Sequence, residues 1–282
     1  MAEKIGGQAV IEGVMMKSDS KYSVAVRRKN NRIISKSGQF QSITKKSKFL
    51  ALPFVRGVFI LFEILVLGMK VLSWSANQAA KEEGEELTLF SLILTVLFAV
   101  ILGIGLFVAL PLLLTQIISK SEGIVFNIVD GGFRIVIFVV YIFAISMLRD
   151  IRRVFQYHGA EHKAVHCYEQ KQKLTVENVR KFSTLHARCG TAFIVIVLII
   201  SIVVFTFVSS QNIWAKLLVR IALLPVIAGA SYEFLKLSDK YQANWFVKLL
   251  ALPGLAVQKI TTREPDEKQI EVAIHALKDV LR

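Results

Sequence analysis

Long apolar runs constrain the fold of this chain more than any other feature. Residues 87–118 contain no charged side chain, and further apolar runs cover 133–148, 191–208 and 213–235. A helix of about 20 apolar residues is long enough to cross the hydrocarbon core of a bilayer, and helices of this length are not needed in a small soluble core. The sequence therefore predicts a mainly α integral membrane protein, a polytopic helical bundle with about four spans.

The basic residues predict how this bundle is oriented. The formal net charge is +14, and eleven Lys or Arg residues lie in 1–50, nine in 149–189 and eight in 236–282, whereas 73–87 has one Lys and four Glu. Basic segments next to spans stay in the cytoplasm. We therefore expect a multi-pass protein with both termini cytoplasmic and with membrane lipids as partners. This reading of the charge excludes nucleic acid as a partner, and it is compatible with a homo-oligomer.

Six segments follow from these patterns. Alternating residues around Asn30 and Asn31 predict a β-hairpin preceded by a further strand, and charges at Arg56, Glu63 and Lys70 predict an amphipathic or re-entrant interfacial helix. The segments are a cytoplasmic β-rich part (1–49), the interfacial helix (50–74), a first transmembrane hairpin (87–148) with an outer connection at 119–132, a cytoplasmic His-rich segment (149–189), a second transmembrane hairpin (190–235), and an interfacial segment with a cytoplasmic C-terminal helix (236–282).

The His-rich segment carries the candidate chemistry. Three of the five histidines lie in 156–169, and we expect the helix of the preceding span to continue through them. On a helix, residues three and four apart share a face, so one stripe holds His158, His162, His166 and Glu169, with Glu161 beside it. The order His-x-x-Glu-His at 158–162 matches the inverted zincins, in which two histidines hold zinc and the glutamate activates water.

Helix geometry limits what this stripe can bind. At about 1.5 Å per residue, His158 lies roughly 12 Å along the axis from His166, so one zinc ion cannot take all three histidines. Either His158 and His162 form the site, or His162 and His166 form it, or two ions bind. We favour the first arrangement, with His166 outside the coordination sphere, because it leaves Glu161 in the position of the general base. We expect zinc, with manganese or iron as alternatives.

The remaining ligand is left open. Cys189 forms His186-x-x-Cys189, a spacing that suits a metal site, and in a reducing compartment a disulfide to Cys167 is not expected. The candidates for a third ligand are Glu12, Glu169, Glu177, His186, Cys189 and Glu233.

Four motifs extend this pattern over nearly the whole chain: Gly6-Gly7-Gln8-Ala9-Val10-Ile11-Glu12-Gly13-Val14-Met15-Met16, the stretch 157–166, the stretch 178–190 and Thr261-Thr262-Arg263-Glu264-Pro265. In these motifs the chain resembles the YqhQ-like family of bacterial integral membrane proteins, a domain of unknown function often labelled a predicted metal-dependent enzyme. The resemblance implies a bacterial cell membrane and a metal site, but no substrate. The functional residues that it carries over are Glu12, His158, Glu161, His162, His166, Arg188 and Cys189.

Two functions remain in competition. The first is a metal-dependent hydrolase at the cytoplasmic membrane surface, in which His158 and His162 hold the ion, Glu161 is the base and Arg188 binds an anionic group. The second is a non-enzymatic membrane scaffold or transport-accessory protein with a structural metal or polar cluster. An open cavity over Glu161 would favour the enzyme, and a filled four-ligand site would favour the scaffold.

Overall fold

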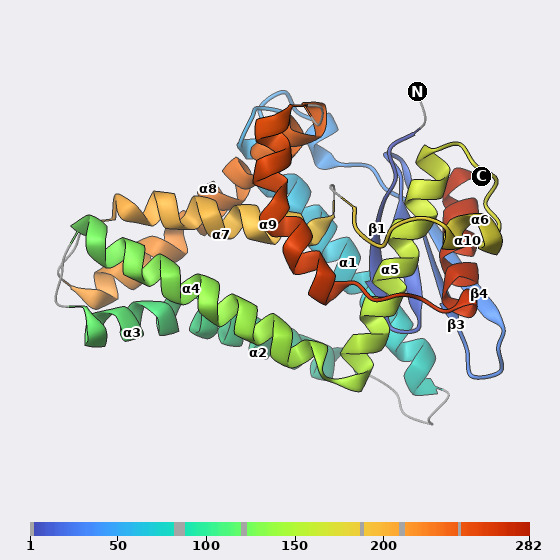
Figure 1. Cartoon of the computed structure of the whole chain (residues 1–282), viewed down its shortest axis with the longest axis horizontal. Coiled ribbons are helices and arrows are strands. Elements are labelled where there is room, and N and C mark those ends of the chain that lie inside the picture. Colours follow the sequence, from blue (N-terminus) through green and yellow to red (C-terminus); the bar gives the residue numbers. More distant parts are fainter. Residues whose placement is uncertain (1–2, 82–87, 120–122, 187–188, 209–211, 242–243) are drawn as a thin grey trace.

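A four-stranded antiparallel sheet lies at one end of a mainly helical molecule (Figure 1). The computed structural model describes residues 3–81, 88–119, 123–186, 189–208, 212–241 and 244–282. The strands, in spatial order, are β1 (Gly6–Val10), β2 (Gly13–Lys17), β3 (Lys21–Arg27) and β4 (Ile33–Gln39). The helices are η1 (Ile43–Lys45), α1 (Val55–Lys81), α2 (Leu89–Ile104), the π-helical turn η2 (Gly105–Ala109), α3 (Leu110–Ile118), α4 (Gly123–Ser146), α5 (Arg149–Glu169), α6 (Val176–Arg180), α7 (Gly190–Thr206), α8 (Ile213–Lys240), α9 (Trp245–Thr261) and α10 (Glu267–Leu281).

The predicted N-terminal hairpin is present as β3 and β4, in which Arg27 pairs with Ile33. The single strand expected before it is instead two strands, β1 and β2. They are joined by a tight turn in which Glu12 adopts a φ of +54°. The sequence does not reveal that the chain reverses direction here, because the residues on both sides of the turn are apolar and are typical of a single strand.

The sheet is covered on both faces. Val14, Met16 and Ala25 pack on α5 and α10, and the opposite face packs on Leu67 and Val71 of α1. Because neither face meets water, the residues of β2 and β3 are buried almost without alternation. This packing fixes α5, the helix that carries three of the histidines, against the sheet.

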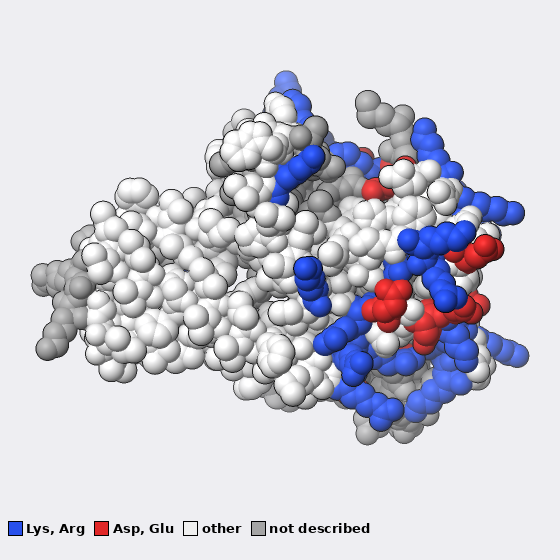
Figure 2. Space-filling model, viewed as in Figure 1, with Lys and Arg blue, Asp and Glu red and all other residues white. Residues whose placement is uncertain are grey.

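The apolar helices form a bundle that extends away from the sheet (Figure 1). Among the described residues, three helical stretches are long and apolar enough to cross a membrane: Ile93–Ile118, Gly123–Ser146 and Ile213–Ser238. The shorter apolar helix α7 packs between α4 and α8. Figure 2 shows the charged side chains gathered over the half of the molecule with the sheet, while the described residues visible in the far half of the bundle show no Lys, Arg, Asp or Glu. This separation indicates association with a membrane.

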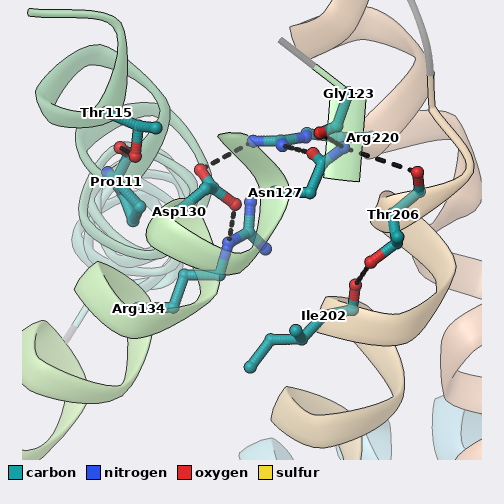
Figure 3. A network of polar contacts seen from close by, with 9 residues as sticks. All are labelled: Pro111, Thr115, Gly123, Asn127, Asp130, Arg134, Ile202, Thr206 and Arg220. Atoms are coloured by element: carbon teal, nitrogen blue, oxygen red, sulfur yellow. Dashed lines mark hydrogen bonds and ion pairs between the residues drawn. The ribbon is translucent and has the colours of Figure 1, made fainter. Parts of the chain in front are cut away.

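The connection expected at 119–132 is shorter than predicted, because α4 already begins at Gly123. Asp130, expected in that connection, lies inside the helix and is 1% exposed. It accepts hydrogen bonds from Arg134 (2.9 Å) and from Arg220 of α8 (2.8 Å), and Arg220 also donates to Asn127 (2.9 Å; Figure 3). Paired with two guanidinium groups, the Asp130 carboxylate is accommodated within an otherwise apolar bundle.

The expected continuity between the preceding span and the histidine helix is wrong. Helix α4 ends at Ser146, Leu148 is extended (φ −68°, ψ 132°), and α5 begins at Arg149. Figure 1 shows α5 leaving the direction of α4 and running along the sheet. The turn is needed because Tyr157, Ala160 and Ala164 of α5 are buried in the core beside the sheet.

The C-terminal helix is present as predicted. Asp266 caps α10 in a capping box with Gln269, which satisfies the first backbone amides, and Ile270 and Leu277 are buried. Upstream, α9 continues through Pro253 and packs on α7 and α4. The link between α9 and α10 crosses α5, where Arg263 N–H donates to the Phe155 carbonyl (2.9 Å).

Candidate metal centre

Backbone carbonyls set the orientation of His158 and His162 on α5. His158 Nδ1–H donates to the Thr261 carbonyl (2.9 Å), and His162 Nδ1–H donates to the Thr184 carbonyl. Because a carbonyl oxygen can only accept, each neutral ring carries its proton on Nδ1 and leaves Nε2 available as a ligand. Burial, together with the neighbouring His158, lowers the pKa of His162 to about 2, so this imidazole stays neutral.

Cys189 meets these two rings from the start of α7. Its Sγ atom lies 3.1 Å from His158 Nε2, and the ligand atoms of His158, His162 and Cys189 all lie within 4.8 Å of one another. Bonds of about 2.0 Å to nitrogen and 2.3 Å to sulfur would place tetrahedral ligand atoms roughly 3.3–3.6 Å apart. The three side chains therefore fit one zinc-sized ion with small adjustments. Burial raises the pKa of the Cys189 thiol.

Glu161 lies beside these ligands with a carboxylate that is not fully hydrogen-bonded. The residue is 6% exposed, and its Oε2 atom has no hydrogen-bond partner among the described residues. Burial raises the pKa of this carboxyl to about 8, and the neighbouring His158 opposes the shift. A buried carboxylate oxygen without a donor is costly, so this atom fits a site that takes a cation, water or a substrate donor.

The edge strand β1 approaches Glu161 so closely that a side chain at one position would displace the Glu161 side chain. A Cβ atom built on Gly7 would lie 2.6 Å from Oε1 of Glu161, whereas one built on the adjacent Gly6 would meet nothing within 4 Å. The backbone of β1 thus forms one wall of the site.

A cavity of about 430 Å³ opens beside this cluster. Its polar lining includes His158, Glu161, His162, His186 and Cys189. The rest of the lining is mainly apolar and comes from β1 with the preceding Ile5 and from α4, α5 and α7, with Ala9, Ile142, Ile145, Val154, Phe155, Val165 and Ile194. The cluster therefore faces open space that continues toward the apolar bundle.

His166, the third histidine of the stripe, belongs to a second group with Glu169 and His186. One ligand atom from each of these residues lies within 4.8 Å of the others. His186 Nε2 is 3.3 Å from Glu169 Oε2, and His166 Nε2–H donates to the Leu185 carbonyl (2.9 Å). The stripe is thus divided between two neighbouring groups.

Two other expected ligands lie away from both groups. Glu12 binds Arg153 through both carboxylate oxygens and approaches the Tyr157 hydroxyl (3.3 Å). Glu233 of α8 binds Arg56 of α1.

Glu177, a third candidate ligand, is exposed and pairs with Lys181 (3.6 Å). Arg188 lies outside the described residues.

Sequence reasoning missed the groups that hold the ligands in place. The carbonyls of Thr184 and Thr261 orient the imidazoles, and Gly159 lets the Thr261–Arg263 link cross α5, since a Cβ atom there would lie 2.0 Å from the Arg263 carbonyl oxygen. Gly7 and Thr261 fall within motifs that resemble the family, but a backbone carbonyl has no residue-type signature that would reveal its role.

Comparison of the sequence with known proteins shows the family of this chain. The model of a family described as a protein of unknown function (DUF1385) matches residues 52–282. The chain is also 34% identical over 297 residues to the uncharacterized protein YqhQ of Bacillus subtilis (strain 168), an alignment that covers 98% of this chain and 92% of that protein. No solved structure matches the chain. The chain therefore belongs to the YqhQ-like family, whose function is unknown.

Proposed function

We propose that this protein is a metal-dependent hydrolase that acts at the cytoplasmic surface of the bacterial cell membrane. One observation carries the proposal: the Glu161 carboxylate, with an unpartnered oxygen, stands beside the ligand atoms of His158, His162 and Cys189 at the wall of an open cavity. Three protein ligands next to an open position are the arrangement of catalytic rather than structural zinc sites.

Zinc is the ion that this donor set suits best. Two imidazole nitrogens and a thiolate favour zinc or iron, and the sulfur ligand disfavours manganese, which prefers oxygen ligands. A divalent ion held there would supply Lewis-acid activation of water and of the scissile bond.

Glu161 is the proposed general base. A general base has to lie within reach of the water from which it takes a proton, and Glu161 lines the same cavity as His158, His162 and Cys189. The Thr184 and Thr261 carbonyls keep the two imidazoles in the tautomer that leaves Nε2 to bind the metal. Arg188 remains the proposed ligand of an anionic group on the substrate, on sequence grounds.

The cavity favours an amphiphilic substrate. Its lining combines the proposed ligands and Glu161 with Ile142 and Ile145 of α4 and Ile194 of α7. The acyl chain of such a substrate would lie along these helices, and the bond to be hydrolysed, in its polar part, would lie next to Glu161. Lipids and lipid-linked compounds have this chemistry.

The proposed topology has four crossings, by α2–α3, α4, α7 and α8, with α1 and α9 at the cytoplasmic interface. To test it, Ser119→Cys and Ser47→Cys are labelled in intact cells with a membrane-impermeant maleimide. We expect Ser119→Cys to react from outside and Ser47→Cys to react after permeabilisation, and the opposite pattern would contradict the topology. Background should be low because Cys167 and Cys189 are both buried.

Metal analysis tests the centre itself. The full-length protein, purified in detergent and loaded with zinc, is compared with His158→Ala and His162→Ala, and with His275→Ala as a matched control. His275 lies on α10 and contacts Asp279 (3.4 Å), far in sequence from the cluster. We expect the first two variants to lose an equivalent of zinc that the control retains. Equal zinc in all four proteins would reject the site.

Glu161→Gln tests catalysis. On a panel of fluorogenic acyl esters and phosphodiesters with short and long chains, we expect the wild type to prefer long chains. Because Glu161→Gln lacks the base, its rate of hydrolysis should be about 10²–10⁴-fold lower than that of the wild type, while it retains zinc. Hydrolysis that survives in Glu161→Gln would remove Glu161 from the mechanism.

The alternative is a scaffold or transport-accessory role with a closed structural metal site. Glu161 lines the same cavity as the three proposed ligands, and in a closed site its carboxylate would move to the ion as the fourth ligand. In that case Glu161→Gln would weaken zinc binding as much as His162→Ala does, and no hydrolysis would be found.

A further inference from the structure

We propose that His166, Glu169 and His186 form a second metal site, separate from the first, and that its ion holds His186 against α5, three residues before the point at which Cys189 meets His158. The inference goes beyond the proposed hydrolysis, since it concerns an additional ion with a positioning role.

The geometry of the group fits a small divalent ion. One ligand atom from each residue lies within 4.8 Å of the others, and His186 Nε2 is 3.3 Å from Glu169 Oε2. Two atoms bonded to one ion at about 2.0–2.1 Å with tetrahedral angles are roughly 3.3–3.4 Å apart. Two imidazoles and a carboxylate suit zinc and other first-row divalent ions.

The two groups are neighbours but cannot share one ion. The imidazoles form a row in which the ring centroid of His186 lies 5.6 Å from that of His162 and 4.5 Å from that of His166. Along α5, however, residues 158–162 and 166–169 are centred roughly 11 Å apart at 1.5 Å per residue. Co-catalytic ions lie about 3.5–4 Å apart, so the second ion would act on structure rather than on the reacting bond.

The segment that would be held carries a ligand of the first site. His186 and Cys189 lie three residues apart, and the two residues before His186 are held on α5 by hydrogen bonds from His162 to the Thr184 carbonyl and from His166 to the Leu185 carbonyl. Gln258 of α9 also exchanges two hydrogen bonds with the backbone of His186, each 2.9 Å. An ion joining the His186 side chain to α5 would complete this anchoring and position Cys189.

Zinc stoichiometry tests the inference. The full chain in detergent is stripped with a chelator, reloaded with zinc, desalted and measured by mass spectrometry of the metal. We expect two zinc ions per wild-type chain, and one in Glu169→Gln, in His186→Ala and in His158→Ala. The control His275→Ala should keep two.

Cobalt loading shows which site has been lost. The thiolate-to-cobalt charge-transfer absorption reports the Cys189 site alone, so it should persist in Glu169→Gln and disappear in His158→Ala. Because the second ion positions Cys189, Glu169→Gln should also weaken cobalt binding at the first site by about 10–100-fold, the range found for residues that support a metal ligand.

The outcomes separate this inference from the proposed function. One zinc per wild-type chain that persists in Glu169→Gln and is lost in His158→Ala would overturn the second site and leave the first. Zinc that is lost in Glu169→Gln and kept in His158→Ala would support the second site and reject the proposed catalytic centre. Zinc-free wild type would overturn both. Glu169→Gln is the decisive variant because the side chain is partly exposed and its amide replacement has the same shape.

Discussion

The Nε2 atom of His158 lies 3.1 Å from Sγ of Cys189, while Nδ1 of the same ring donates to the Thr261 carbonyl. In the metal-free protein this short contact places a thiol beside an imidazole nitrogen that can only accept. Before both atoms bind one ion, the sulfur has to lose its proton.

Zinc binding should therefore strengthen with pH. Metal binding releases the proton of a thiol, and burial raises the pKa of Cys189, so zinc affinity should rise about tenfold per pH unit between roughly pH 7 and 8. His162, with its pKa lowered to about 2, does not compete. Competition titrations against a chromophoric chelator measure the slope, which Cys189→Ser should flatten. A slope that is the same in both proteins would remove Cys189 from the ligand set.

The stability of the metal-free protein should fall as pH rises. Burial raises the pKa of Glu161 from 4.5 to about 8, so between these values the folded state binds a proton that the unfolded state has released, and each step upward in pH favours unfolding. The loss should be on the order of several kcal/mol once pH passes about 8. Melting curves in the presence of a chelator check this.

Glu161→Gln supplies the comparison for that experiment, because a neutral amide does not titrate. Its melting temperature should exceed that of the wild type by a margin that grows from pH 5 to pH 9. A constant difference over this range would contradict the raised pKa.

Gly7→Ala should disturb the site although the added group is a single methyl. That methyl would lie 2.6 Å from the Glu161 carboxylate, and overpacking of this kind costs about 1–3 kcal/mol. Gly6→Ala is the matched control: it lies on the same strand with open space around its Cβ position, and its stability should change by less than about 0.5 kcal/mol. Thermal unfolding in detergent distinguishes them, and equal effects would show that β1 does not press on Glu161.

Asp130→Asn should destabilise the bundle strongly. The substitution leaves Arg134 and Arg220, both buried, without the carboxylate that they share, and breaking a buried ion pair costs about 3–5 kcal/mol. Glu177→Gln removes an exposed pair with Lys181 and should cost less than about 1 kcal/mol. Similar melting temperatures for both variants in detergent would mean that the buried network contributes little to stability.

The sequence predicted the elements in which the spacing of apolar residues follows directly from which side of the element is buried. Apolar runs predicted the bundle, and the pattern of Ile270 and Leu277 predicted α10, because each reflects a single environment along the element. The break at Leu148 was missed because its residues fit a helix, and tertiary packing on the sheet overrides that preference. The early start of α4 was missed because Asp130 reads as a loop residue until its partners on α4 and α8 are known.

The candidate site was predicted in part for a similar reason. Spacing along one helix brought His158, Glu161 and His162 together, and the equal depth of His186 and Cys189 at the start of the next span suggested their approach. Spacing could not decide whether His186 or Cys189 is the third ligand of the site. It also could not show that Glu12 binds Arg153 and that Glu233 binds Arg56. Those choices depend on contacts between segments far apart in the chain.

The link that crosses α5 has a consequence for biosynthesis. The Thr261 carbonyl orients His158, Gly7 lies against Glu161, and Cys189 is supplied from between them, so the site combines residues from both ends of the chain. During synthesis, this orienting carbonyl is added to the chain after all of the apolar helices from α2 to α8. The metal centre that we propose could therefore be completed only after Thr261 has been added to the chain, and a chain that stops before Thr261 would lack the group that orients His158.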